Sequence, residues 1–99
     1  MIVYNVTVKI TNQAHDEWFK WMKSEHIQEV LDTGYFVENA MYKVVLEDDD
    51  GVTYSIQYLA TSKENLQKYF DHESLRLQAK TKKKFEGQYV AFRTILERV

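Results

Sequence analysis

Residues 17–36 read EWFKWMKSEHIQEVLDTGYF and carry two apolar stripes that one straight helix cannot bury together. The first stripe has the spacing of an amphipathic helix and consists of Ala14, Trp18, Trp21 and Met22. The second stripe, Ile27, Val30 and Leu31, lies about 120 to 180° around the axis from the tryptophans, at about 100° per residue. We therefore predict a break or kink near residues 24–26 and a short second helix that ends at Gly34.

Outside this helical region, the chain shows the alternation of apolar and polar residues that is typical of β-strands. The predicted strands are residues 2–10, 35–47, 52–60 and 88–98. The acidic run at 48–51 (DDDG) predicts a tight hairpin turn in which Gly51 supplies a positive φ.

A second helical segment is expected between the third and fourth strands. Thr61, with Glu64 three residues later, is typical of a capping box, and the apolar spacing continues to about Lys83 with an interruption near His72. The order β-α-β-β-α-β, with right-handed crossovers, predicts an α+β ferredoxin-like fold. This fold is a four-stranded antiparallel sheet with both helices on one face. The length predicts one domain, residues 1–99.

Composition excludes several classes of protein. The net charge is −2, and the one basic run, at 80–84, is typical of a solvated helix end, so no nucleic-acid partner is expected. No stretch approaches the ~18 consecutive apolar residues of a membrane span. There is no cysteine and the first residues lack the pattern of a signal peptide, so we expect a cytoplasmic protein without disulfides.

The sheet face away from the helices is predicted to mix apolar and polar side chains. We expect Asn5, Gln57 and Arg93 on this face, whereas the facing of the strand that holds Tyr42 is undecided. Such a mixture suits a sheet that stacks on a second copy of the chain and encloses a partly polar cavity. The alternative is an ordinary solvated face. We therefore expect a homodimer that binds a small organic ligand in a partly polar cavity, either between the helices and the sheet or inside the barrel that two copies would form.

Two motifs resemble a known family. They are W-x-x-W-M-x-x-x-H-I-x-E-V-L-x-T-G-x-F, from Trp18 to Phe36, and F-R-T-x-L, from Phe92 to Leu96. The chain resembles a family of short uncharacterised bacterial proteins, a domain of unknown function. The resemblance implies a branch of the dimeric α/β-barrel superfamily, whose members include cofactor-independent monooxygenases, haem-degrading enzymes and muconolactone-isomerase-like proteins.

Candidate chemistry is sparse. The three histidines, His15, His26 and His72, lack the spacing of a zinc site, so no metal and no cofactor are expected. His26 is the best catalytic candidate, because a neutral imidazole at the predicted helix break could exchange a proton near pH 7. The competing hypothesis, which we favour, is that His26 braces the break by hydrogen bonds to helix-end carbonyls or to Glu25 or Glu29.

Arg93 could hold a ligand carboxylate bidentately or form an ion pair between subunits. The candidate ligand-binding residues are Asn5, Trp18, Tyr42, Gln57 and Arg93. Three functions stay open: a small-molecule-binding dimer, a cofactor-independent monooxygenase or isomerase with His26 as acid or base, and a structural or regulatory dimerisation module.

Overall fold

The computed structural model describes residues 1–45 and 50–99. Its elements, in chain order, are β1 (Ile2–Ile10), α1 (His15–Trp21), η1 (Met22–His26), α2 (Ile27–Asp32), β2 (Glu38–Lys43), β3 (Val52–Ala60), α3 (Lys63–His72), α4 (Ser74–Phe85) and β4 (Tyr89–Glu97).

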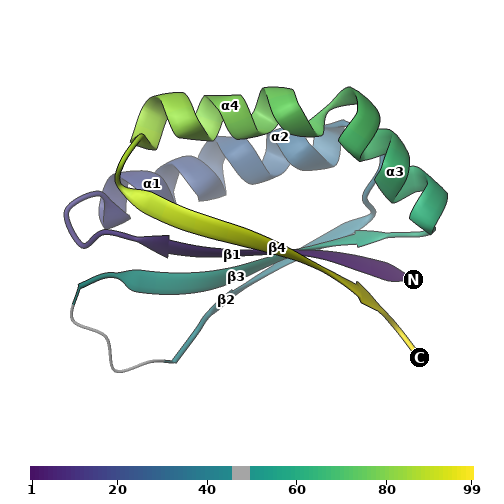
Figure 1. The fold of residues 1–99 in the computed structure, drawn as a ribbon, viewed down its shortest axis with the longest axis horizontal. Coiled ribbons are helices and arrows are strands. Elements are labelled where there is room, and N and C mark those ends of the chain that lie inside the picture. Colours follow the sequence, from purple (N-terminus) through teal and green to yellow (C-terminus); the bar gives the residue numbers. More distant parts are fainter. Residues whose placement is uncertain (46–49) are drawn as a thin grey trace.

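The four strands form one antiparallel sheet in the order β2-β3-β1-β4. All the helices lie on one face of it, and α4 runs above the edge strand β4 (Figure 1). The predicted ferredoxin-like β-α-β-β-α-β fold is confirmed.

The predicted change of phase is real, and the helix is irregular where a break or kink was predicted, but the backbone is not broken there. The backbone stays helical from α1 through η1 to α2, and η1 is a π-helix in which the Ile27 N–H donates to the Met22 carbonyl, five residues earlier. The Ser24 hydroxyl donates to the Lys20 carbonyl at 2.7 Å, a side-chain bond that tends to bend helices. The extra residue in the wide turn therefore absorbs the phase change without interrupting the helix.

The wide turn places four side chains on one face. In a regular α-helix His26 would lie about 80° around the axis from Trp18, at 3.6 residues per turn. One additional residue in the turn subtracts about 100°, so His26 returns to within about 20° of Trp18. Met22 and Val30 share this face with them, and all four side chains line the same cavity.

The second helical segment is divided as expected, since Glu73 departs from helical geometry (φ −126°) between α3 and α4. Its N-cap is Ser62, whose hydroxyl accepts from the Asn65 N–H at 3.1 Å; the prediction of Thr61 was wrong by one residue.

The predicted second strand was too long, because β2 covers only Glu38–Lys43. Phe36 precedes it and is buried in the core, which explains the apolar pattern without a strand. Gly34 has the positive φ expected of a residue that ends a helix (85°).

Gly51 does not have the positive φ that the turn prediction assigned to it. A Cβ at this position would lie 2.8 Å from the Ile10 carbonyl oxygen, so glycine permits a close approach of β1 instead. Asp48 and Asp49, the centre of the predicted turn, lie outside the described residues.

The core lies between the helices and the sheet. Trp18 is 1% exposed, and Phe85 and Leu77 of α4 are buried to the same degree. Trp21 packs against Phe85 with ring centroids 5.4 Å apart. The two tryptophans therefore join the first helical region to α4 and the sheet, as the sequence predicts.

Deletion of Lys23, an exposed residue of η1, should be tolerated. Loss of one residue converts the π-turn to regular α-helix and leaves Trp18, Val30 and their neighbours on the same face. We expect the free energy of unfolding in urea to change by less than about 1 kcal/mol. Deletion of Lys83 from the regular helix α4 is the matched control. It rotates Phe85 by about 100° out of the core and should cost at least about 3 kcal/mol. Equal losses in both variants would contradict this reading of η1.

Candidate functional site

A cavity of about 50 Å³ lies between the helices and the sheet; we call it the inner cavity. Most of the residues that line it are apolar or aromatic, and a few are polar. The residues are Trp18, Met22, His26 and Val30 from the first helical region, Tyr69, Leu77, Gln78 and Thr81 from α3 and α4, and Tyr4, Val6, Val8, Ile56, Tyr58, Tyr89, Ala91 and Arg93 from the sheet. This volume holds a few water molecules or a small chemical group.

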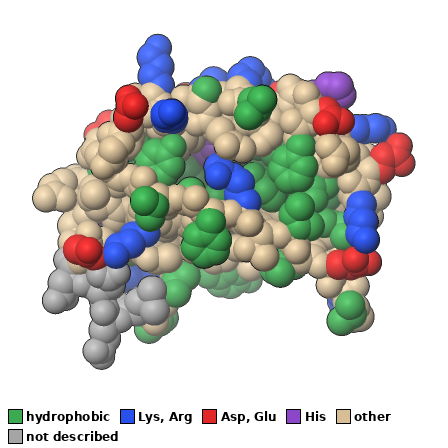
Figure 2. All heavy atoms as spheres, in the orientation of Figure 1, with side chains coloured by type: hydrophobic (Ala, Val, Ile, Leu, Met, Phe, Trp, Pro, Cys, Tyr) green, Lys and Arg blue, Asp and Glu red, His purple; other side chains and the backbone are tan. Residues whose placement is uncertain are grey.

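A larger groove of about 410 Å³ lies outside it, between α4 and β4; we call it the outer groove. It is lined by Leu75, Gln78, Ala79, Lys82, Tyr89, Ala91 and Arg93. Four of these residues also line the inner cavity, so the two spaces adjoin. Figure 2 shows this side of the molecule, where a basic side chain crosses a hollow flanked by apolar surface beneath α4.

His26 reaches the inner cavity with its ring stacked on Trp21, at 4.5 Å between centroids and 23° between planes. Its Nδ1 atom is buried and has no hydrogen-bond partner among residues 1–45 and 50–99. The expected bonds to helix-end carbonyls or to a carboxylate are therefore not made by this nitrogen. Burial lowers the pKa of His26 to about 4, although the carboxylate of Glu29 opposes the shift and the ammonium group of Lys80 adds to it.

Glu29 lies one helical turn after His26 and is tied to α4. Its Oε2 accepts from the ammonium group of Lys80, whereas its Oε1 is buried and has no partner in the described part of the chain. This pair therefore joins α2 to α4 above the cavity.

Arg93 does not lie on the far face of the sheet, so that prediction was wrong. It pairs with Val6 across β1 and β4 and faces the helices, and its Nε donates to the Tyr4 hydroxyl at 3.1 Å. The expectation followed from Val90, Phe92 and Leu96, which make the other side of β4 the more apolar one. The structure instead places those three on the outer face and Arg93 at the cavity.

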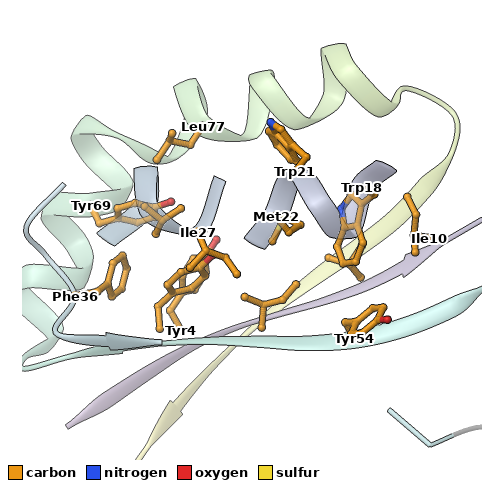
Figure 3. Close-up of a cluster of buried hydrophobic side chains, with 14 of the residues drawn as sticks. Tyr4, Ile10, Trp18, Trp21, Met22, Ile27, Phe36, Tyr54, Tyr69 and Leu77 are labelled. Atoms are coloured by element: carbon orange, nitrogen blue, oxygen red, sulfur yellow. The ribbon is translucent and has the colours of Figure 1, made fainter. Parts of the chain in front are cut away.

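Two tyrosines of the inner cavity, Tyr58 and Tyr69, supply hydroxyl groups that stay protonated. Burial raises the pKa of Tyr58 and of Tyr69, and neighbouring tyrosines add to both shifts. Figure 3 shows Tyr4 of the sheet and Tyr69 of α3 side by side in the same buried cluster as Met22 and Leu77. The hydroxyl groups of Tyr58 and Tyr69 are therefore uncharged near pH 7.

The other predicted ligand-binding residues separate into two groups. Trp18 lines the inner cavity. Asn5 and Gln57 face away from the helices, in a polar network in which the Ser55 hydroxyl donates to Asn5 Oδ1 at 2.5 Å and Gln57 donates to Ser55 at 3.4 Å. Tyr42 pairs with Ser55 on that same outer face. The structure therefore does not bring the five candidates together.

Several lining residues were missed from the sequence, including Tyr58, Tyr69, Gln78 and Thr81. For the first helical region a signal was available: the exact four-residue period of Trp18, Met22, His26 and Val30 fits a helix that contains one wide turn. In the described part of the chain, no group of three histidine or acidic side chains could hold a metal ion. No described helix is long and apolar enough to cross a membrane.

The family described as a domain of unknown function, DUF4286, matches residues 1–99. The chain belongs to the DUF4286 family. No curated protein matches this DUF4286 chain.

Solved structures share its fold at low sequence identity. A mutant of SnoaB, a cofactor-independent oxygenase from Streptomyces nogalater, superposes with a TM-score of 0.65 at 12% identity, over 98% of this chain and 92% of its own. A dimeric ferredoxin-like protein from an uncultured marine organism gives 0.66 at 19% identity, over 100% and 95%. An antibiotic biosynthesis monooxygenase gives 0.67 at 14%, over 100% and 99%. At these identities the likeness establishes the fold alone.

The burial of His26 predicts a pH dependence of stability. Its folded-state pKa of about 4 lies below the ordinary value of 6.5, so the unfolded chain binds more protons between these pH values. The contribution is complete above about pH 6.5 and is lost as the pH falls toward 4, by at most about 3 kcal/mol. The variant His26→Phe keeps a ring against Trp21. We expect its free energy of unfolding in urea to depend less on pH between 6.5 and 4 than that of the wild type. A wild-type His26 ring that titrates near pH 6.5 by NMR would contradict the prediction.

Proposed function

We propose that this DUF4286 protein binds a small organic molecule in the inner cavity and the outer groove. The observation that carries the proposal is the joined space itself, in which apolar walls surround a few convergent polar groups, His26 and Arg93 among them. Binding sites for small molecules have this composition and lie in the same range of volume as the outer groove.

Proton transfer by His26 is the second candidate function, favoured by the neutral ring at the cavity. A general base is most effective when its pKa lies near the working pH. A pKa of about 4 makes this ring about 300-fold less basic than a free imidazole, which has a pKa of about 6.5. Binding is therefore the primary proposal, and catalysis requires a ligand whose own charge raises the pKa of His26.

We further propose that the protein is a cytoplasmic homodimer that associates through the outer face of the sheet. Val90 and Phe92 are 68% and 64% exposed there, and Leu96 and Tyr42 extend the apolar surface around the polar network of Asn5. Apolar surface of this kind is typical of an interface. The fold is shared with a solved protein described as dimeric. The absence of cysteine suits a reducing compartment.

The substitution Ala91→Phe tests the binding site, because Ala91 lines both the inner cavity and the outer groove. Phenol, titrated into ¹⁵N-labelled wild-type protein, should shift the amide signals of the lining residues with a Kd in the millimolar range, about what a small fragment reaches. Ala91→Phe should abolish these shifts.

Ala40→Phe is the matched control, because Ala40 is a half-buried strand residue on the outer face of the same sheet. It should leave phenol binding unchanged, and both variants should keep a dispersed spectrum. Shifts that persist in Ala91→Phe would contradict the proposed site.

The dimer has its own test. Light scattering at micromolar concentration should give twice the chain mass for the wild type, and Phe92→Asp should give the monomer mass because it buries a charge in the interface. Val37→Asp, at an exposed residue that precedes β2, is the control and should stay dimeric. A wild-type monomer would remove the proposed interface and leave the binding site within one chain.

A further inference from the structure

The two charged side chains that line the site, within residues 1–45 and 50–99, are both cationic. Among the residues that line the inner cavity and the outer groove, Lys82 and Arg93 are cationic, and none is an aspartate or a glutamate. Both cations line the outer groove, and Lys82 does not reach the inner cavity. The outer groove therefore carries both cations, and Arg93 lies where the groove meets the inner cavity, whose other described lining residues include no Asp, Glu or Lys.

Among the described residues, a single hydrogen bond holds the guanidinium of Arg93 and leaves its two terminal nitrogens available for a ligand. Its Nε is used by the Tyr4 hydroxyl at 3.1 Å. In the described part of the chain, its terminal nitrogens have no hydrogen-bond acceptor and its guanidinium forms no ion pair. A guanidinium anchored through one nitrogen can present its two others to a carboxylate, which it binds in a bidentate manner.

The deeper part of the inner cavity disfavours the charged end of such a ligand because a charge loses its hydration there. His26, Tyr58 and Tyr69 are neutral, and Arg93 is the one cation among the described residues that line the inner cavity, so an acidic group placed beyond it among these neutral groups would lose its hydration away from its counter-ion. The inner cavity is also small, about 50 Å³, whereas the outer groove offers about 410 Å³. The body of a ligand therefore fits the groove, and only a small uncharged group fits beneath the helices.

We infer that the ligand is a small organic acid whose acidic group lies against Arg93 and Lys82 in the outer groove, with an uncharged end that points into the inner cavity toward His26. The inference rests on the proposed function, because it specifies the ligand of that same site. It adds both a chemical class and an orientation.

Two probes of matched size and shape test the charge requirement, 4-hydroxybenzoate and the uncharged 4-hydroxybenzamide. Each is titrated into ¹⁵N-labelled wild-type protein at pH 7. We expect the acid to bind about tenfold more tightly than the amide, about what one partly exposed charge-assisted pair contributes. Signals of the groove and cavity residues should shift with both probes.

Substitutions of Arg93 and Lys82 test whether these two cations cause the tighter binding of the acid. Arg93→Gln should bring the acid to within about twofold of the amide, and a dispersed ¹⁵N spectrum shows that the variant is folded. Lys82→Gln should weaken acid binding about two- to threefold. The matched control is Lys83→Gln, one residue further along α4 and outside the lining of the groove, which should keep the full preference.

The outcomes separate the inference from the proposal beneath it. If the amide binds in the groove as tightly as the acid, the organic-acid inference is wrong and the binding site stands. If neither probe shifts the groove and cavity signals, both are wrong. A preference for the acid that survives Arg93→Gln would place the anion elsewhere and overturn the inference.

Discussion

The hydrogen bond from the Ile27 N–H to the Met22 carbonyl, five residues earlier, is the constraint on which the arrangement of the site depends. It admits one extra residue into the first helical region and rotates everything after it by about 100° relative to a regular helix. Both apolar stripes thereby reach the same sheet. The same rotation brings His26 over the cavity beside Trp18. Core packing and the polar content of the site are two results of one backbone feature.

The two faces of the sheet carry different kinds of side chain. On the helix side, the bond between Arg93 and the Tyr4 hydroxyl fixes a cation at the edge of an otherwise neutral cavity. On the outer side, polar side chains near Asn5 satisfy one another, and apolar side chains of β4 lie exposed beside them. The two faces therefore differ in chemistry, since the helix side carries a cation beside neutral groups and the outer side carries exposed apolar groups beside a polar network.

The sequence predicts the fold well because its periodicities are long and unambiguous, as in β1 and β3, where alternation extends over nine residues. It does not distinguish a break from a π-turn, since both produce the same phase change and only the backbone hydrogen bonds, which continue through η1, tell them apart. Arg93 was placed on the wrong face because β4 carries apolar side chains outward, and alternation indicates the core only when a single face of a strand is buried. The cavity depends on the spacing of α4 from β4, which no local pattern encodes.

The central claim is that a π-turn, rather than a break or a regular helix, presents a neutral His26 to the cavity. Scalar couplings transmitted across hydrogen bonds, measured by NMR on ¹³C- and ¹⁵N-labelled protein, report directly which carbonyl accepts from a given amide. The account predicts a coupling between the Ile27 amide nitrogen and the Met22 carbonyl carbon. A coupling from Ile27 to the Lys23 carbonyl carbon, four residues earlier, would show a regular α-helix and contradict it.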